Sequence, residues 1–302
     1  MPLVSVVMPS YNHDKFISES VRSVLNQSLG DLELVIVDDA SIDRSRAVIE
    51  DFARRDQRIR CVFHSANLGI ARSVNDGISE ARGRFIAFTA SDDVWCEDKL
   101  ARQIQVLQSN EDLVVWAEGE VIDAEGRPTG ELFTAKHGAS KKKKTGRILH
   151  ELLEGSFIFG SALVFLRRNI DDIRYDASLK YLNDYQFHVD LAARYEYFFI
   201  PQPLAKYRTH GANTNVDRLG YSEDSLLVGE RFLKEYGNAV PNRVRSRIYL
   251  NMARAHFNLG NRGKAIECAL SVLRLDPSPQ LIGLLSQEAV MHISKRLRGP
   301  RS

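Results

Sequence analysis

Short apolar runs alternate with segments of helical period in the first part of the chain, and this alternation limits the fold more than any other feature. The apolar runs lie at residues 3–8, 34–37, 59–63, 84–89 and 113–116. Between them, apolar side chains recur about one helical turn apart, for example at Ile17, Val21 and Val24. Such regular alternation predicts an α/β fold, in which a mostly parallel sheet is flanked by helices on both faces.

Polar side chains follow three of the predicted strands at the point where each strand ends. The segments are Pro9-Ser10-Tyr11-Asn12 after the first strand, Asp38-Asp39-Ala40-Ser41-Ile42-Asp43 after the second, and Ser91-Asp92-Asp93 after the fourth. Open sheets of this kind bind ligands beyond the carboxyl ends of their strands. We therefore expect the three loops to open onto one rim, where an aromatic face, a base-reading carboxylate and a metal could hold a nucleotide diphosphate.

The adjacent carboxylates of Asp92 and Asp93 are the main indication of a metal site. Neighbouring carboxylates repel each other unless a cation or solvent screens them. Their hard oxygen atoms suit Mg²⁺ or Mn²⁺, and such a divalent metal would also hold the phosphates of a substrate. The alternative is a solvated turn that caps the helix beginning near Glu97.

The composition argues against several classes of protein. With 302 residues, of which 44% are hydrophobic and 26% charged, the chain can form a large core and a smaller second domain. A net charge of +2 argues against nucleic-acid binding, which usually needs a marked basic excess. Cys61, Cys96 and Cys268 are too widely spaced for a disulfide framework or a zinc ribbon, and they favour a cytoplasmic location. We expect neither a signal peptide nor a spanning helix, so any contact with the inner face of the membrane should be peripheral.

The order and spacing of several motifs over residues 3–213 resemble those of the family-two glycosyltransferases. The segments that carry the resemblance are Ser5-Val6-Val7-Met8-Pro9-Ser10-Tyr11-Asn12, Val37-Asp38-Asp39-Ala40-Ser41-Ile42-Asp43, Asn67-Leu68-Gly69, Asn75-Asp76-Gly77 and Ser91-Asp92-Asp93. The resemblance implies the GT-A fold, which has a Rossmann-like sheet. It also implies the transfer of a sugar from a nucleotide-sugar with inversion at the anomeric carbon.

The resemblance further implies which residues bind the nucleotide-sugar. The matching positions are Pro9, Tyr11, Asn12, Asp39, Asn67, Arg72, Asp92 and Arg208. Pro9 and Tyr11 match the segment that lines the nucleobase and ribose, and Asp39 matches the carboxylate that accepts a hydrogen bond from the base, typically uracil. Ordinary structural interpretations also exist, because Pro9 can end a strand, Tyr11 can be a half-buried aromatic and Asp39 can cap the next helix. Asn67 can likewise belong to a simple turn.

For the metal, the resemblance implies Asp92 and Asp93 jointly, with His210 as a further ligand. The commonest form of the family has an aspartate where this chain has Ala90, so metal binding can be weaker here. Arg208, which lies two residues before His210, can neutralise phosphate charge. His210 can alternatively steady the diphosphate, or it can serve the structure only.

A second motif, at residues 181–187, resembles the family's catalytic-base motif. Many members have Glu-Asp where this chain has Asn183-Asp184, so the role falls on Asp184. Inversion needs one carboxylate opposite the leaving diphosphate, which takes the proton of the acceptor hydroxyl as the hydroxyl attacks. The alternative is that Asp184 caps the helix that follows.

Two further segments lie between these motifs. Residues 141–144 are four lysines, which can form a solvated loop or can contact an anionic acceptor or lipid head groups. The apolar run at residues 157–165 predicts a buried strand, with Gly160 and Ser161 where a substrate would approach closely.

The chain from residue 217 onward predicts helices only, so we divide it into domains at 1–216 and 217–302. One tetratricopeptide-like repeat fits the positions Ala253, Gly260, Ala265, Ala269 and Pro277. A last helix carries Leu281, Leu284, Leu285, Ile293 and Leu297, and its end gathers Lys295, Arg296, Arg298 and Arg301. We expect this region to bind a protein partner or to form an oligomer. Its basic end either rests on an anionic membrane or only stabilises the helix through a favourable interaction with the helix dipole.

The sequence therefore predicts a cytoplasmic, metal-dependent glycosyltransferase that uses a UDP-sugar and a glycan, polysaccharide or lipid-linked acceptor. The alternative is a nucleotide-sugar-binding scaffold without turnover, which the alanine at position 90 suggests. The retention of Asp184 favours the enzyme. An NAD-dependent oxidoreductase is excluded, because no Gly-x-Gly-x-x-Gly follows the first strand.

Overall fold

The computed structural model describes residues 1–211 and 217–277, and these residues fall into two compact units. The first unit takes its residues from Met1–Leu152, Ser156–Ser178 and Asn183–Thr214. The second takes its residues from Leu153–Gly155, Leu179–Leu182 and Asn215–Ser302. The domain boundary expected after residue 216 adjoins a stretch outside the described residues, and it is kept as a prediction.

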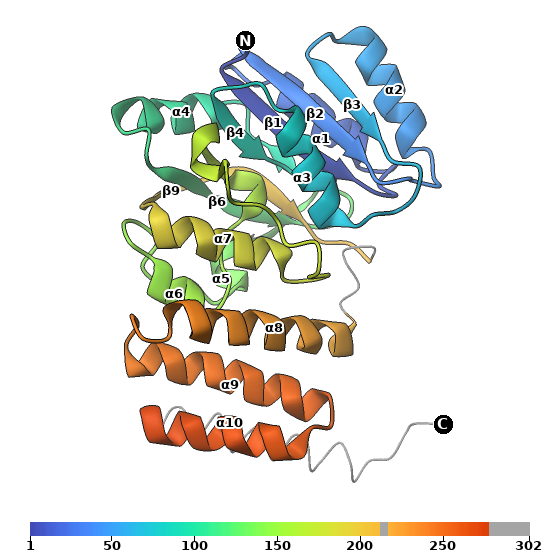
Figure 1. Ribbon diagram of the computed structural model, residues 1–302. Helices are drawn as coiled ribbons and strands as arrows, with labels where there is room; N and C mark the ends of the chain where they lie inside the picture. The colour runs from blue at the N-terminus through green and yellow to red at the C-terminus, as the bar shows by residue number, and fades with distance from the viewer. Residues whose placement is uncertain (212–216, 278–302) are drawn as a thin grey trace. The chain divides into compact units, whose positions relative to one another are not determined.

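Within the described residues, a sheet of nine strands forms the centre of the first unit (Figure 1). The strands are β1 (Val4–Ser10), β2 (Leu32–Asp38), β3 (Ile59–Phe63), β4 (Phe85–Phe88), β5 (Val94–Trp95), β6 (Val114–Ile122), β7 (Pro128–Leu132), β8 (Val164–Leu166) and β9 (Tyr197–Arg208). Their order across the sheet is β3-β2-β1-β4-β8-β6-β9-β5, and β7 pairs with β6. The strands from β3 to β4 are parallel neighbours, as are β6 and β9. In contrast, β8, β5 and β7 are antiparallel to their partners.

Helices cover both faces of the parallel half of the sheet. The helices of the first two hundred residues are α1 (Ile17–Leu25), α2 (Ser45–Arg55), α3 (Ile70–Glu80), α4 (Lys99–Ser109), α5 (Phe133–Lys136), α6 (Leu149–Leu153), α7 (Asn183–Arg194) and the short 3₁₀ helices η1 (Gly160–Ala162) and η2 (Arg167–Ile170). Val6 of β1 packs in one core with Ile17 of α1 and Ile49 of α2. Val7 points to the opposite face, where Gly77 of α3 lies against it. The predicted α/β class is confirmed. The second half of the sheet mixes parallel and antiparallel neighbours, and its antiparallel strands need no helical crossover.

Gly77 allows α3 to approach the sheet closely. A Cβ at this position would lie 2.5 Å from Val7 Cγ1 and 3.3 Å from Val37 Cγ2. We expect Gly77→Val to lower the free energy of unfolding by about 1–3 kcal/mol, the usual cost of overpacking a core. Urea denaturation would measure this loss, with Gly30→Val as the control because a Cβ at Gly30 would have nothing within 4 Å. Equal losses for the two variants would contradict close packing at Gly77.

The predicted strand over residues 157–165 is wrong. Only Val164–Leu166 (β8) is a strand, and Gly160–Ala162 forms the 3₁₀ helix η1. Phe157 and Phe159 are as buried as strand residues would be. A short buried run of this kind cannot be assigned to a strand from its hydrophobicity alone.

The second unit, as far as it is described, consists mainly of α8 (Arg218–Tyr236), α9 (Asn242–Asn258) and α10 (Arg262–Leu275). α9 packs against both of the other helices, and Figure 1 shows the three side by side. Gly260, with a φ of 78°, lies in the turn before α10. These helices agree with the prediction of an all-helical region, but the tetratricopeptide assignment is not established by them. The predicted last helix and its basic end lie outside the described residues.

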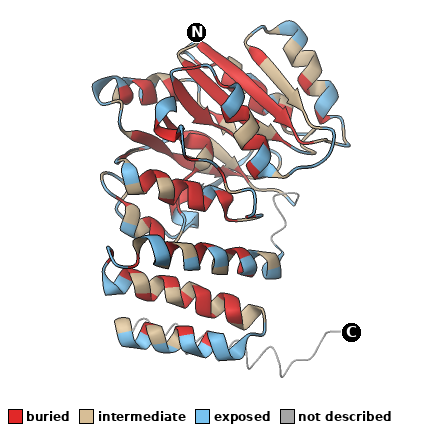
Figure 2. Ribbon diagram, in the orientation of Figure 1, coloured by how far each residue is buried: buried red, intermediate tan, exposed pale blue. Residues whose placement is uncertain are grey.

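Figure 2 shows that buried residues fill the central strands of the first unit, whereas α10 has many exposed side chains. Three of these are apolar and recur at helical spacing, namely Ile266, Leu270 and Leu273. Among the described residues, no helix is both long enough and apolar enough to cross a membrane.

Two of the four consecutive lysines are only partly exposed, and their ammonium groups contact neighbouring residues. Lys142 Nζ donates to the carbonyl of Glu151 at 3.1 Å and lies 4.8 Å from the centroid of the Phe157 ring. Lys144 Nζ donates to the carbonyl of Ser140 at 3.2 Å. Contact of this segment with an acceptor or with lipid head groups is still a prediction.

Candidate active site

Hydrogen bonds join the loops after β1 and β2, and they fix the side chains at this rim of the sheet. The amide of Asn12 donates to Ser41 Oγ at 2.9 Å, and the amide of Ile42 donates to Asn12 Oδ1 at 2.9 Å. The amide of His13 donates to Ser45 Oγ, also at 2.9 Å. Asn12 has a φ of 55°, a left-handed conformation that asparagine adopts more readily than most residues. The Asn12 side chain therefore serves the loop itself.

Pro9 and Tyr11 lie at the carboxyl end of β1, as the sequence predicts. Pro9 pairs with Val37 of β2, and Tyr11 follows the strand with 43% of its surface exposed. The ring of Tyr11 is thus open to a ligand and does not fill the core. Contact of Tyr11 and Pro9 with a base stays a prediction.

Three protein donors hold the buried carboxylate of Asp39. The amides of Leu68 and Gly69 donate to its Oδ1 and Oδ2 at 2.8 Å, and His64 Nδ1 lies 2.7 Å from Oδ1. A carboxylate has about four acceptor sites, so among the described residues one site on Oδ2 is left for a further donor. The alternative that Asp39 caps α2 is wrong, because its carboxylate binds the turn before α3.

His64 orients Asp39, and no sequence motif pointed to it. Its second nitrogen, Nε2, lies 3.1 Å from Asp76 Oδ2, so the ring bridges two carboxylates. Its position directly after the strand at residues 59–63 was the only available signal. Arg72 is exposed and pairs with Asp76 at 3.3 Å, and Asn67 is exposed in the turn that binds Asp39. Both therefore lie on the predicted rim.

The two adjacent carboxylates after β4 point in different directions. Asp93 points inward, where Ser161 Oγ donates to its Oδ2 and the amide of Arg208 donates to its Oδ1 at 3.0 Å. Burial raises the pKa of Asp93 well above its usual range, and the charge of Asp92 raises it further. The joint assignment of the metal to both residues is therefore corrected, because Asp93 anchors the loop. Ser161 serves that anchor, and close approach of a substrate to it stays a prediction.

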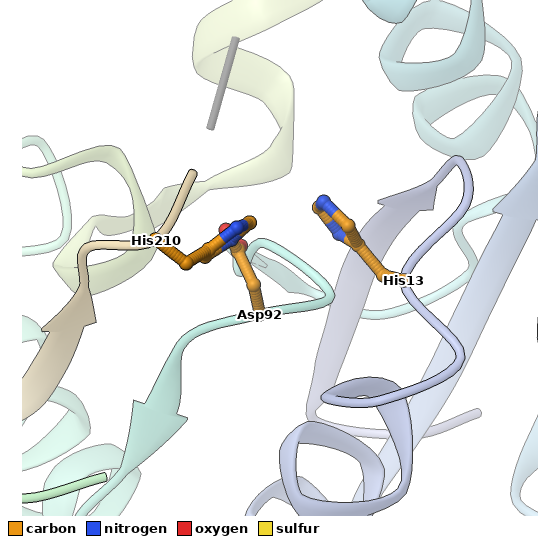
Figure 3. A group of neighbouring side chains, drawn as sticks. All are labelled: His13, Asp92 and His210. Atoms are coloured by element: carbon orange, nitrogen blue, oxygen red, sulfur yellow. The ribbon is translucent and has the colours of Figure 1, made fainter. Parts of the chain in front are cut away.

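Asp92 points instead toward two histidines, as Figure 3 shows. Asp92 Oδ2 lies 2.9 Å from His210 Nε2, and His13 approaches from the loop after β1. One ligand atom from each of these three residues lies within 4.8 Å of the others. Ser91 Oγ lies 2.7 Å from His13 Nδ1 and orients its ring. The predicted ligand His210 is thus joined by His13, which carried no signal beyond its place after Asn12.

This group of side chains fits a divalent transition metal. Burial lowers the pKa of His13, which keeps the imidazole in the neutral form that binds metals. Two imidazoles and a carboxylate suit Mn²⁺ better than Mg²⁺, which prefers oxygen ligands throughout. Phe16 packs against His210 with 4.4 Å between the ring centroids, which limits movement of that ring.

Asp184 lies in the first turn of α7, at the second residue of the helix. Its side chain is exposed to solvent, yet the surrounding protein desolvates the carboxyl group and raises its pKa. The amide of Tyr185 donates to Oδ1 at 2.6 Å and acts in the opposite direction. Burial also raises the pKa of Tyr207, and the charges of Asp93, Asp92 and Asp184 raise it further. Tyr207 is therefore within electrostatic reach of both carboxylate motifs.

Sequence comparison decides the family. The profile "Glycosyl transferase family 2" matches residues 5–174, which is more than half of the chain. The chain belongs to glycosyl transferase family 2.

Glycosyltransferases from several bacteria resemble this chain. An uncharacterized glycosyltransferase of Rickettsia typhi is 27% identical over 240 residues, which are 78% of this chain and 72% of that protein. A putative teichuronic acid biosynthesis glycosyltransferase of Bacillus subtilis is 42% identical over 35% of this chain and 42% of its own. The UDP-Glc:alpha-D-GlcNAc-diphosphoundecaprenol beta-1,3-glucosyltransferase of Escherichia coli is 39% identical over 40% of this chain and 47% of its own. The last two relatives are therefore matched over less than half of their length.

Solved structures share the fold of this family-2 chain. S. aureus TarS 1-349 in complex with UDP-GlcNAc has a TM-score of 0.66 and 18% identity, covering 95% of this chain and 88% of that one. The mannosyltransferase PcManGT from Pyrobaculum calidifontis, in complex with GDP-Man and Mn²⁺, has a TM-score of 0.61 and 17% identity, covering 98% and 82%. At such low identity the likeness establishes the fold alone, and this fold is the predicted GT-A type.

One predicted donor-binding residue of this family-2 chain has a different environment from the expected one. Arg208 is 1% exposed, and its Nε donates to the carbonyl of Asp92 at 2.8 Å. Its Nη2 pairs with Glu19 at 2.6 Å. The geometry does not support the predicted contact with phosphate, because the guanidinium is buried and holds the loop that carries Asp92. Ala90 stands where the commonest form of the family has an aspartate, and its amide donates to Ser161 Oγ at 3.0 Å.

Proposed function

We propose that this protein is an inverting, metal-assisted glycosyltransferase that moves a sugar from a UDP-sugar to a hydroxyl of a glycan, polysaccharide or glycolipid. The observation that carries the proposal is the convergence of His13, Asp92 and His210 at the rim of the sheet. Asp39 belongs to the same rim, because its amide donates to the carbonyl of Ser10 at 2.9 Å. The UDP-Glc in the name of the Escherichia coli relative and the UDP-GlcNAc in the TarS complex support the choice of UDP.

The rim has separate groups for each part of such a donor. The exposed ring of Tyr11 would pack against the base, and the remaining acceptor site of Asp39 would take the imide N–H of uracil. His13, Asp92 and His210 would hold Mn²⁺, which when bound neutralises the diphosphate and so improves it as a leaving group.

Asp184 would act as the base on the acceptor side. It would take the proton of the acceptor hydroxyl as that oxygen attacks the anomeric carbon and the bond to UDP breaks. A single displacement of this kind inverts the anomeric centre. The raised pKa of Asp184 brings its proton affinity closer to that of a useful base at neutral pH.

A thermal-shift panel of UDP-, GDP-, dTDP- and CMP-sugars, each with and without Mn²⁺, tests the donor. We expect UDP-sugars with Mn²⁺ to give the largest rise in Tm, since a ligand at a hundredfold excess over its Kd adds about 2.7 kcal/mol of stability. Equal responses to all four bases, or no response to any, would reject the assignment. Binding of a UDP-sugar without release of UDP, across a panel of acceptors, would favour the scaffold alternative.

We expect Asp39→Ala to weaken UDP binding by about tenfold or more, because a hydrogen bond to a charged group is worth about 1.5–3 kcal/mol. Isothermal titration in Mn²⁺ would measure the loss. Inorganic pyrophosphate, which has no base, is the control ligand, and its affinity should change little. Asp39 also holds the turn before α3, so a similar loss for both ligands would mean that the loop collapsed. Unchanged UDP affinity would remove the base-reading role from Asp39.

A further inference from the structure

Four aromatic side chains gather in the first unit, and we call them the aromatic corner: Phe133, His137, Phe159 and Tyr207. Phe133 stacks on His137 at 4.1 Å and on Phe159 at 4.6 Å between ring centroids. Tyr207 stands nearly perpendicular to all three rings, with interplanar angles of 84°, 76° and 88°. Its centroid lies 5.3 Å from Phe133 and 5.7 Å from Phe159. The rings thus form two surfaces at right angles.

The aromatic corner has a buried base and an open side. Phe133 and Phe159 are buried, whereas Tyr207 is half-buried and His137 is exposed. Within residues 1–211 and 217–277, neither the Tyr207 hydroxyl nor the ring nitrogens of His137 have a hydrogen-bond partner. The open side therefore combines aromatic surface with unused polar atoms, as binding sites for small polar ligands do.

Strands β6 and β9 support the aromatic corner, and β9 connects it to the metal-site loop. Tyr207 of β9 pairs with Val121 of β6, and the next residue after Tyr207 binds Asp93 through its amide. Gly119 of β6 leaves room for the buried rings, because a Cβ there would lie 2.7 Å from the ring of Phe159. Arg208, which follows Tyr207, also donates through its Nε to the carbonyl of Asp92 at 2.8 Å, so the aromatic corner adjoins the loop that carries the candidate metal ligand.

We propose that the aromatic corner is the acceptor subsite and that it binds a pyranose ring of a glycan. This inference rests on the proposed function and specifies its acceptor. The apolar C–H face of the sugar packs on the ring of Tyr207, and the sugar hydroxyls pair with the Tyr207 hydroxyl and with a ring nitrogen of His137, whose ring stands at 76° to that of Tyr207. A hydrocarbon chain would leave these polar atoms unpaired, which is unfavourable in a partly buried site.

Saturation-transfer NMR on the full chain, with UDP and Mn²⁺ present, tests the proposal with methyl pyranosides of the gluco, galacto, manno and N-acetylgluco series. We expect at least one pyranoside to bind, with the strongest saturation on the C–H protons of one face. Tyr207→Ala and His137→Ala should each lower its affinity by about tenfold. Tyr207→Phe keeps the ring and loses only the hydroxyl, so its loss should be smaller, about threefold to tenfold.

Matched controls separate failure of this inference from failure of the donor assignment. Tyr221→Ala replaces a tyrosine of α8 that is 43% exposed and lies outside the aromatic corner, and it should not change pyranoside binding. UDP affinity is measured for each variant, because retained affinity shows that the variant has folded. Wild-type protein that binds UDP but no pyranoside overturns the proposal, as does equal pyranoside affinity of Tyr207→Ala and wild type. Octyl glucoside that is saturated only along its alkyl chain would assign the corner to a lipid and would overturn it too.

Discussion

Asp184→Asn is expected to lower the rate of sugar transfer by about 10²- to 10⁴-fold, the range for loss of a general base. Asparagine keeps the size of the side chain and can still accept a hydrogen bond from the amide of Tyr185, but it cannot take the acceptor proton. UDP affinity should stay near the wild-type value, since the proposed donor contacts lie elsewhere. Single-turnover transfer and UDP titration would measure the two effects separately. Asp190→Asn, on the same helix, is the matched control. Full transfer by the Asp184 variant would move the base to Asp190 or Glu196.

The pH dependence of transfer should follow from the same carboxyl group. Desolvation raises the pKa of Asp184, so the group becomes protonated, and unable to act as a base, at a higher pH than an ordinary aspartate. Transfer should therefore fall as the pH decreases through this raised pKa and should recover above it. The acid limb of the kcat/KM profile should lie above the pKa of an ordinary aspartate. A profile that stays flat through that region would argue against Asp184 as the base.

Asp92→Ala is expected to lower UDP affinity in Mn²⁺ by about 10²-fold or more, because a metal–phosphate contact is worth several kcal/mol and each 1.4 kcal/mol is a factor of ten. EDTA should cause the same loss in the wild-type protein and no further loss in the variant. The electron paramagnetic resonance signal of free Mn²⁺ would measure metal binding directly, without any transfer reaction. His13→Ala should also weaken Mn²⁺ binding, because His13 supplies one of the three ligand atoms.

Two control variants sharpen this test. His150→Ala removes an exposed histidine of α6 and should leave Mn²⁺ affinity unchanged. Asp93→Asn keeps a side chain that can bond to Ser161, so it too should bind Mn²⁺ nearly as the wild type does. Equal losses for the Asp92 and Asp93 variants would restore the joint assignment, and binding by Asp92→Ala at wild-type strength would remove the site.

The rim of the sheet could be predicted because polar residues directly after apolar runs have no place in a packed core. Tyr11, Asp39 and Asp92 were all found in this way, and the structure brings their loops to one edge. The directions of Asp92 and Asp93 could not be predicted. The groups that bind Asp93 come from Ser161 and Arg208, which are 68 and 115 residues away along the chain. A sequence pattern over a few residues contains no information about such partners.

Other features depended on packing in the same way. A single histidine has no periodicity, so His13 and His64 became visible only when their carboxylate partners were in place. The run at residues 157–165 has the hydrophobicity of a strand, but most of it is not in the sheet. The mixed half of the sheet and the two short segments that join the second unit also follow from long-range contacts. Local helices and parallel strands, in contrast, follow from nearby residues and were predicted well.

The opposite directions of Asp92 and Asp93 restrict how the loop between β4 and β5 can change during evolution. Inserting or deleting one residue there would shift each side chain into the place of its neighbour, so that either the ligand position or the anchor position would lose its carboxylate. Replacing a residue, as at Ala90, leaves both directions unchanged. We therefore expect this loop to vary among descendants in the identity of its residues but not in their number. A gap at residues 89–94 in an alignment would mark a lineage that has lost the cation.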